Sequence, residues 1–251
     1  CVRRGLSYDA DDIVVTSGAT EALFVTMMGL LNPGDEVVIP TPAFILYESI
    51  ARLCRACPVL VDTEADSFQL AREKLEAAVT RRTKAIVLAS PNNPTGTALP
   101  LEDIKRILEA ARGHGPMLGA EIGSPARASD CVVVIDEAYA EFRRPGVPSA
   151  LELVEPDNPH LAVTRTMSKA FGAAGLRLGY LAADRALVDA LHVVRLPYHL
   201  SAVTQAAALA ALSHRDELMA QVASLRDERD ALVAWLRGRG LTAHESDANF
   251  V

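Results

Sequence analysis

Residues 132–139 are Val-Val-Val-Ile-Asp-Glu-Ala-Tyr, and this stretch decides the fold class. Four consecutive β-branched apolar residues predict a short strand that is buried on both faces. Such a strand is typical of a parallel sheet with helices on both sides. The acid Asp136 ends the apolar run, so a carboxylate is expected at the edge of the sheet.

Short apolar runs of the same kind alternate with longer segments of helical period on either side of this stretch. The alternation predicts an α/β fold, with a mostly parallel sheet and helices on both of its faces. The expected strands are Ile13–Val15, Glu36–Ile39, Pro58–Val61, Ala85–Ala89, Val132–Ile135, Leu161–Thr164 and Leu178–Ala182. The expected helices are Ala19–Leu31, Phe44–Cys54, Leu70–Val79, Leu101–Ala111 and Arg185–Val194.

After residue 195 one helix follows another. An Ala-rich helix at Ser201–Ser213 precedes a longer helix that ends at Gly238 and Gly240. An apolar stripe is expected along the longer helix. It consists of Leu218, Val222, Leu225, Leu232 and Leu236. We therefore expect a large domain over residues 1–195, and connecting helices with the start of a smaller domain over residues 196–251.

Three further features concern the extent of the chain. It opens at Cys1 rather than Met and stops at Phe250-Val251, which resembles the beginning of a strand. Both termini are therefore expected to be cut. The segment Gly113–Asp130 is rich in Gly, Ala, Pro and Ser, which predicts a surface loop or an insertion.

The composition argues against a nucleic-acid or membrane partner. The net charge is −7, and basic pairs such as Arg143-Arg144 are scattered, whereas phosphate neutralisation needs a clustered basic face. We expect these pairs on the solvated surface. No apolar stretch of about 18 residues and no signal pattern occurs. The expectation is a cytoplasmic protein.

The spacing Cys54-Arg-Ala-Cys57 raises the question of metal or redox chemistry. A structural zinc site needs a second pair of ligands, and neither the other cysteines nor the six histidines supply that spacing. We expect no metal site, and we expect both Cys54 and Cys57 to be packing residues.

Polar residues follow four of the expected strands directly. They lie in Thr16–Glu21, Ser90–Gly96, Asp136–Tyr139 and Thr166–Lys169. Ligands of open parallel sheets bind outside the carboxyl ends of the strands. Hydroxyls, an amide, a carboxylate, a lysine and the nearby Arg177 are thus expected to converge on one edge of the sheet.

Lys169 differs from the other lysines, because it follows a strand end and small residues succeed it. Burial or nearby cations disfavour the protonated form of a lysine amine. The neutral amine can then act as a Schiff-base nucleophile. Asp136 could pair with a protonated ring nitrogen, while Tyr139 and Asn93 could bond a ring oxygen. Taken alone, Lys169 could equally form a salt bridge, and Asp136 could cap its strand.

An anion site is expected beside these groups. Backbone N–H groups of Ala19 and Thr20 begin a helix after Gly18 and could hold a phosphate. The further expected phosphate ligands are Thr166, Ser168 and Arg177. Phe44 could offer an aromatic face to the same ligand or be an ordinary core residue.

Three competing site types lack their motifs. The chain contains no G-x-x-x-x-G-K-[ST] for a P-loop ATPase, no G-x-G-x-x-G after the first strand for a dinucleotide site, and no G-x-S-x-G for a hydrolase.

The set resembles the fold-type I pyridoxal-phosphate (PLP) enzymes, specifically the class I and II aminotransferases, over essentially the whole chain. The resemblance rests on Asn93-Pro94-Thr95-Gly96, Asp136-x-x-Tyr139, Ser168-Lys169 and Arg177, in the family's order. Within the family, residues 132–139, 165–172, 195–201 and 246–250 are most similar to histidinol-phosphate aminotransferases.

The resemblance implies PLP as cofactor, with Lys169 as its covalent anchor and as the acid and base of the reaction. The implied cofactor-binding residues are Ala19, Thr20, Phe44, Asn93, Asp136, Tyr139, Thr166, Ser168, Lys169 and Arg177. It also implies an amino donor and a 2-oxo acid as substrates, and a homodimer when full length. Histidinol phosphate and 2-oxoglutarate would give imidazole acetol phosphate and glutamate.

Departures from the family pattern leave alternatives open. An upstream tyrosine that the family supplies to the neighbouring subunit's phosphate site is missing, and so is an arginine of the small domain. The stretch between Asn93 and Asp136 is longer than usual. We therefore expect an encoded cofactor pocket without a complete substrate pocket. The alternatives are an aromatic or other general aminotransferase, and a PLP-binding module without turnover.

Overall fold

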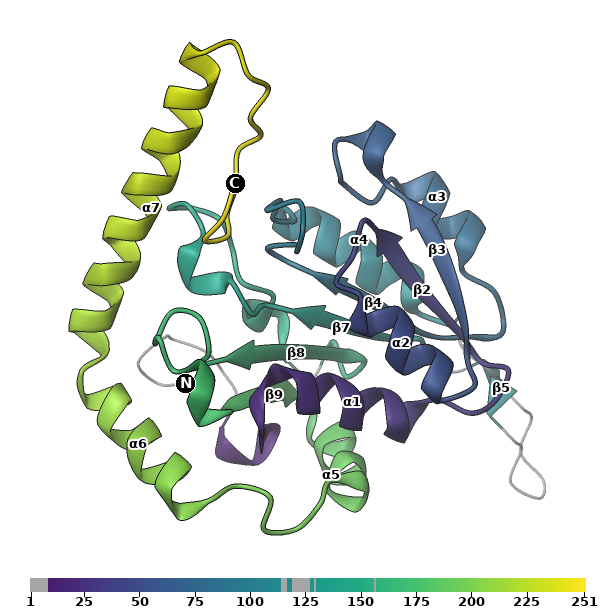
Figure 1. Cartoon of the computed structure of the whole chain (residues 1–251). Helices are drawn as coiled ribbons and strands as arrows, with labels where there is room; N and C mark the ends of the chain where they lie inside the picture. Colours follow the sequence, from purple (N-terminus) through teal and green to yellow (C-terminus); the bar gives the residue numbers. More distant parts are fainter. Residues whose placement is uncertain (1–8, 114–116, 119–126, 129, 156) are drawn as a thin grey trace.

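A seven-stranded sheet runs through the molecule, in the order β1-β9-β8-β7-β4-β2-β3. The computed structural model describes residues 9–113, 117–118, 127–128, 130–155 and 157–251 (Figure 1). The strands are β1 (Ile13–Thr16), β2 (Glu36–Thr41), β3 (Cys57–Asp62), β4 (Thr83–Ala89), β7 (Val132–Asp136), β8 (Leu161–Thr166) and β9 (Gly179–Ala183). From β8 to β3 all neighbours are parallel. The predicted α/β class with a mostly parallel sheet is confirmed.

The pairing of the central strands brings their carboxyl ends to one level. Asp136 of β7 lies opposite Ala89 of β4 on one side and Thr164 of β8 on the other. Residues that follow β4, β7 and β8 therefore emerge beside one another. This register explains why residues distant in sequence meet at one edge.

Strand β9 was not predicted to run antiparallel, yet it does so against both β1 and β8. Its first residue, Gly179, pairs with Thr166, the last residue of β8. The start of β9 therefore lies at the same edge as the end of β8. Arg177, which precedes β9, reaches the edge for this reason.

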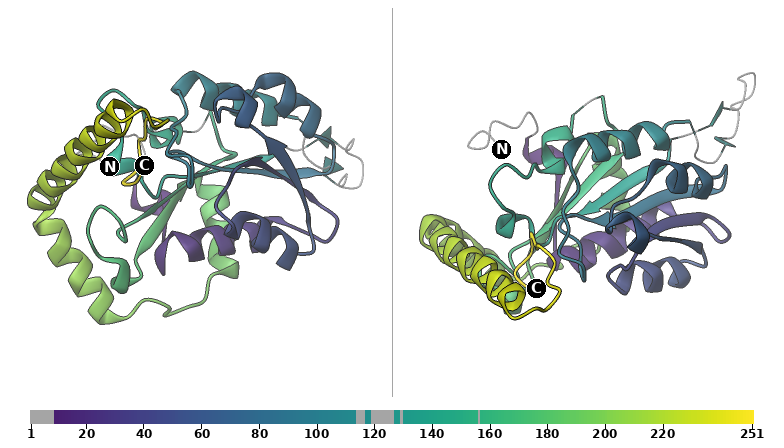
Figure 2. Two further views of the ribbon diagram at one scale, coloured as in Figure 1. Left: turned by 45° about the horizontal axis from the view of Figure 1, so that its top comes forward. Right: turned by 90° about the horizontal axis from the view of Figure 1, so that it is seen from above.

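Helices cover both faces of the sheet, as predicted (Figure 2). The helices α1 (Gly18–Leu30), α2 (Leu46–Leu53) and α5 (Arg185–Val194) pack on one face. The helices α3 (Arg72–Ala78) and α4 (Leu101–Ala111) pack on the other. The short 3-10 turns are η2 (Ala10–Asp12), η3 (Glu64–Asp66), η4 (Ala140–Phe142), η5 (Ala150–Leu153) and η6 (Ala174–Leu176).

Two further helices lie outside these layers, α6 (Ala202–Ser213) and α7 (Arg215–Gly238) (Figure 1). The predicted apolar stripe of α7 is wrong in part, because Leu225 and Leu232 are 52% and 44% exposed. The buried positions are Val222, Arg229 and Val233, and α7 packs mainly against η4. One side of α7 therefore meets the rest of the described chain, and Arg226 on it also donates to the carbonyl oxygen of Arg143.

Residues 241–251 contain no helix or strand, so the expected strand at Phe250-Val251 is not observed. The segment returns from the far end of α7 toward the sheet (Figure 1). The backbone N–H of Asp247 donates to the carbonyl oxygen of Gly96 at 2.7 Å, and its carboxylate accepts from Arg144. Gly96 must lack a side chain here, since an added Cβ would lie 2.4 Å from Ser246 Oγ.

Several smaller expectations can be compared with the structure. Cys54 is buried at the end of α2, but Cys57 is exposed, so packing was the wrong expectation for Cys57. Arg143 is not a solvated surface residue, because its side chain is mostly buried beside Glu137. Arg144 is partly solvated, with a side chain 37% exposed, and it also pairs with Asp247.

The described part of Gly113–Asp130 contains an antiparallel pair, β5 (Met117–Leu118) and β6 (Arg127–Ala128). The remainder of that predicted loop or insertion, like Cys1, lies outside the described residues. Among the described residues, no cluster of His, Cys, Asp or Glu could hold a metal ion. None of the described helices combines the length and apolarity needed to cross a membrane.

Candidate active site

A pocket of about 260 Å³ lies at the edge of the sheet where β4, β7 and β8 end. All the residues expected to bind a cofactor line it. They are Ala19, Thr20, Phe44, Asn93, Asp136, Tyr139, Thr166, Ser168, Lys169 and Arg177. Six lining residues were not predicted, namely Leu23, Tyr47, Ala89, Pro91, Ala138 and Ala174.

Lys169 follows the end of β8 and its side chain is exposed to the pocket. A backbone hydrogen bond from Met167 to Leu178 fixes the preceding turn at 2.9 Å. The Nζ atom lies 5.3 Å from the centre of the Tyr139 ring. The amine is thus held near an aromatic wall of the pocket and remains accessible to a ligand.

Asp136 is buried at the base of the pocket. Its Oδ1 accepts hydrogen bonds from Thr164 Oγ1 and from the backbone N–H of Ala138, both at 3.1 Å. Its Oδ2 accepts one from the Tyr47 hydroxyl at 2.9 Å. Burial raises the pKa of Asp136, and these hydrogen bonds act against that rise. No cation of the described residues forms an ion pair with it, so a cationic ligand group would fit there.

An anion cradle forms at the start of α1. Gly179 permits it, because a Cβ at this position would lie 2.5 Å from the backbone of Gly18 and Ala19. The start of β9 and the start of α1 can therefore approach closely. The backbone N–H groups at the beginning of α1 and the helix dipole favour an anion at this point.

Arg177 and two hydroxyls complete the cradle. Arg177 Nη1 lies 3.5 Å from Ser168 Oγ, and Thr166 Oγ1 lies 2.9 Å from the same atom. Within the described ranges, Arg177 pairs with no carboxylate, so its charge is available to a ligand. An added Cβ on Gly18 would lie 2.6 Å from Arg177 Nη2, so glycine leaves room for this guanidinium.

Asn93 and Tyr139 also line the pocket and lie close to each other. Asn93 Nδ2 lies 3.5 Å from the Tyr139 hydroxyl, and the Tyr139 ring meets Phe250 edge to face at 5.3 Å between centres. Phe44 is half-buried and meets Tyr47 edge to face at 5.8 Å. Since Phe44 lines the pocket, it is available to contact a ligand ring, which a fully enclosed core residue is not.

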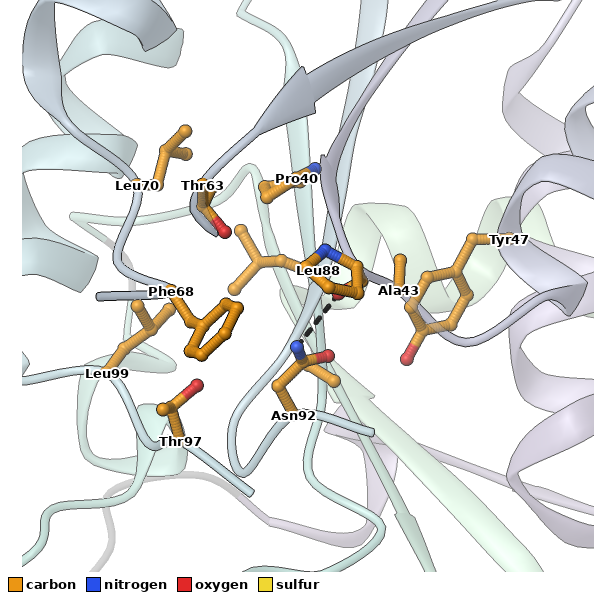
Figure 3. Close-up of a pocket in the computed structure, with 12 residues that line it drawn as sticks. Pro40, Ala43, Tyr47, Thr63, Phe68, Leu70, Leu88, Asn92, Thr97 and Leu99 are labelled. Atoms are coloured by element: carbon orange, nitrogen blue, oxygen red, sulfur yellow. Dashed lines mark hydrogen bonds between the residues drawn. The ribbon is translucent and has the colours of Figure 1, made fainter. Parts of the chain in front are cut away.

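A second pocket, lined mainly by apolar residues, lies behind Tyr47 (Figure 3). Pro40, Leu88 and Leu99 are among its lining residues, and the Asn92 amide donates to the carbonyl oxygen of Pro42 at 2.9 Å. Tyr47 and Ala89 line both pockets, so the two pockets are neighbours.

Sequence reasoning missed Tyr47 and the ion pairs beneath the pocket. Arg165 Nη2 lies 2.6 Å from Glu137 Oε2 and Arg165 Nη1 lies 2.7 Å from Glu141 Oε1, and the first pair is almost inaccessible. A signal for Tyr47 did exist, because it lies three residues after Phe44 at the start of a helix. A buried tyrosine hydroxyl needs a polar partner.

The donor set fits PLP. The amine of Lys169 suits a carbonyl carbon, the unpaired carboxylate of Asp136 suits a protonated ring nitrogen, and the cradle suits a dianionic phosphate. These three groups lie around one pocket.

Comparison with known proteins identifies a family and relatives that are similar in sequence. The family model for "Aminotransferase class I and II" matches residues 3–118 and 120–251. Histidinol-phosphate aminotransferase 3 of Burkholderia lata is 46% identical over 98% of this chain and 62% of its own length. Histidinol-phosphate aminotransferase of Thermobifida fusca is 48% identical over the same shares. The chain thus spans 62% of the length of these two relatives.

Solved structures give the same architecture. The aspartate aminotransferase from Thermus thermophilus with maleate superposes with a TM-score of 0.83 at 30% identity, covering 99% of this chain and 63% of that chain. The aspartate aminotransferase of Thermotoga maritima has a TM-score of 0.85 at 26% identity, covering 98% and 62%.

Proposed function

The chain belongs to the class I and II aminotransferases, and we propose that it carries the cofactor-binding part of a histidinol-phosphate aminotransferase. The observation that carries the proposal is the single pocket in which Lys169, Asp136 and the anion cradle meet. Enzymes of this class depend on PLP. When bound, PLP supplies a carbonyl carbon for the amino group and a ring that withdraws electrons.

Each polar group of the pocket has a task in this proposal. Lys169 Nζ would hold the cofactor through its carbonyl carbon and, as a free amine, would take up and return the proton at the donor's Cα. Asp136 would pair with the protonated ring nitrogen. The hydroxyl of Tyr139 and the amide of Asn93 would donate to the ring oxygen.

The remaining cofactor ligands orient the group. The phosphate would be bound by the N–H groups of Ala19 and Thr20, the hydroxyls of Thr166 and Ser168, and the Arg177 guanidinium. Phe44 would offer its aromatic face to the ring.

The substrates proposed are histidinol phosphate as donor and 2-oxoglutarate as acceptor, giving imidazole acetol phosphate and glutamate. The names of the relatives at 46% and 48% identity support this choice. An aromatic or other general aminotransferase is the second candidate, favoured by the structural likeness to aspartate aminotransferases. Because the chain spans 62% of its relatives, the complete reaction is assigned to a longer protein.

The proposal extends to organisation. Residues 1–195 form the PLP-binding large domain, and residues 196–251 form connecting helices and the start of a smaller domain. The full-length protein is a cytoplasmic homodimer. Exposed apolar side chains support the dimer, among them Phe24 and Met28 of α1 and Leu196 and Tyr198 of the segment before α6.

The experiment that tests the proposal is covalent trapping. The chain is incubated with PLP, reduced with borohydride, and digested, and the modified lysine is identified by peptide mass. Label on Lys169 is expected, and Lys169→Arg should lose it, whereas Lys105→Arg on the surface of α4 should keep it. A folded chain that labels at other lysines or at none contradicts the assignment of Lys169.

Turnover separates the enzyme from a binding module. The loaded full-length protein is mixed with histidinol phosphate, and then with an aromatic amino acid, and the cofactor spectrum is followed. Conversion to the aminated cofactor by histidinol phosphate supports the first candidate, and conversion only by the aromatic donor supports the second. A labelled full-length protein that converts with neither behaves as a binding module.

A further inference from the structure

Among the described residues, Tyr47 is the tyrosine whose hydroxyl donates to Asp136. It extends from α2, its side chain is 1% exposed, and it lines both the candidate site and the apolar pocket shown in Figure 3. A phenylalanine would fill the same volume between Phe44 and the sheet. The hydroxyl is buried all the same, and it donates to Asp136 Oδ2 at 2.9 Å.

The two oxygens of Asp136 differ in how many donors they have. Each carboxylate oxygen can accept about two hydrogen bonds. Oδ1 already has two donors, Thr164 Oγ1 and the N–H of Ala138. Oδ2 has one donor among the described residues, the Tyr47 hydroxyl. The free acceptor position is therefore on Oδ2, the oxygen that Tyr47 holds.

We propose that Tyr47 is a positioning residue that acts on the cofactor through Asp136. It orients the carboxylate so that Oδ2 receives the N–H of the protonated ring, and it keeps Asp136 in the charged form. The inference rests on the proposed function, because it takes PLP as the ligand of the pocket.

The charges around Asp136 agree with this role. Burial and the neighbouring Glu137 raise the pKa of Asp136, while the hydrogen bonds from Tyr47, Thr164 and Ala138 lower it. The charge of Glu137 is offset by Arg165, which lies 2.6 Å from it.

The other titratable groups that face Asp136 come from three directions. Tyr139 follows β7, Lys169 follows β8 and Arg177 precedes β9, and all three line the same pocket. Burial and Asp136 itself raise the pKa of Tyr47, so its hydroxyl stays protonated and remains a donor at neutral pH. Tyr47 is thus the phenolic donor that stabilises the carboxylate.

The test compares Tyr47→Phe with the unaltered chain and with Tyr198→Phe, a matched change at a side chain that is fully exposed in this chain. The dissociation constant for PLP is measured by absorbance from about pH 5 to about pH 9, a range that spans a raised carboxyl pKa. Losing a hydrogen bond to a charged acceptor should weaken binding about tenfold at the acid end. The acid limb of the affinity profile should move up by about one pH unit.

A second readout needs no cofactor. The pKa of Asp136 is measured by carbon-13 NMR of the carboxyl groups in the PLP-free chain, with the resonance assigned by its loss in Asp136→Asn. Tyr47→Phe should raise this pKa by about one unit, and Tyr198→Phe should leave it unchanged.

Each outcome bears on the inference. An equal loss of affinity at every pH, with an unchanged carboxyl pKa, would mean that Tyr47 only packs, and it overturns the inference. An unaltered profile also overturns it. If the unaltered, folded chain binds no PLP, the proposed function fails instead, and the carboxyl titration alone decides whether Tyr47 governs the charge of Asp136.

Discussion

Two regions of the chain, the sheet edge at residues 132–177 and the helical segment at residues 196–251, differ in what holds their side chains. At the edge, polar groups such as Asp136 and Glu137 are buried and bound by several neighbours. In α6, Ala208 is the buried residue, while Val203 and Leu209 are 76% and 69% exposed. Contacts within the chain order the edge, whereas the helical segment presents exposed apolar side chains.

The largest effect should follow from removing the amine at the edge. Lys169→Ala is expected to abolish covalent PLP attachment and to lower turnover by the full-length protein about 10⁴-fold, since it removes the acid and base. Because Lys169 is exposed, the free energy of unfolding should change by less than about 0.5 kcal/mol. Borohydride trapping and urea unfolding measure the two quantities. A variant that keeps its trapped cofactor would refute the anchor.

The next effect concerns the ion pairs beneath the pocket. Glu137→Ala removes the carboxylate 2.6 Å from the nearly inaccessible guanidinium of Arg165 and leaves Glu141 as its carboxylate partner among the described residues. A loss of about 3–5 kcal/mol in the free energy of unfolding is expected. As a control, Glu76→Ala breaks the exposed pair with Arg72 on α3 and should cost less than about 0.5 kcal/mol. Similar losses of unfolding free energy in both variants would show that the buried ion pair stabilises the chain no more than the exposed one.

The sheet edge could be predicted because several physical constraints coincide there. Strand β7 is a continuous β-branched run, so its position and the place of Asp136 at its end follow from composition alone. Parallel strands bring their carboxyl ends together, so the sequence alone predicted that Asn93, Asp136 and Lys169 lie close to one another. The fold class and the lining of the pocket were therefore accessible from the sequence.

Other features could not be derived, because they depend on tertiary pairing. The reversal of β9 has no local signal, since a strand that is buried on both faces is an apolar run whichever way it pairs. Tyr47 meets Asp136 across 89 residues of chain, and only the packing of α2 on the sheet reveals it. On α7, periodicity gave several apolar positions, but which of them is buried depends on the neighbour, and Arg229 was unexpected.

A paired substitution on α7 sharpens this last point. Val222 is 3% exposed and Leu225 is 52% exposed, although both belong to the predicted stripe. Val222→Ala should lower the free energy of unfolding by about 1–2 kcal/mol through lost burial. Leu225→Ala should change it by less than about 0.5 kcal/mol in the isolated chain. Equal losses in the free energy of unfolding would support the predicted stripe and show that a wider face of α7 is buried.

The smallest effect, with the opposite sign, is expected at Asp136 itself. A carboxyl whose pKa is higher in the folded chain than in the unfolded chain binds more protons when folded. The free energy of unfolding therefore falls as the pH rises from the ordinary value of 3.8 through the raised pKa. Asp136→Asn carries no charge and should lack this fall, while its amide can donate to the Tyr47 hydroxyl.

The variant should accordingly match the unaltered chain at low pH and exceed it by less than about 1 kcal/mol at neutral pH, although it no longer retains PLP. Urea unfolding of both cofactor-free chains, at about pH 4 and about pH 7, measures the difference. Hydrogen bonds from Arg144 lower the pKa of Glu245, and they also lower the pKa of Asp247 although burial acts to raise it. A lowered carboxyl pKa gives the opposite dependence of stability on pH. Both chains contain these groups, so their contribution cancels in the difference. If the variant is less stable at both pH values, the hydrogen bonds of Asp136 stabilise the edge more than its buried charge destabilises it.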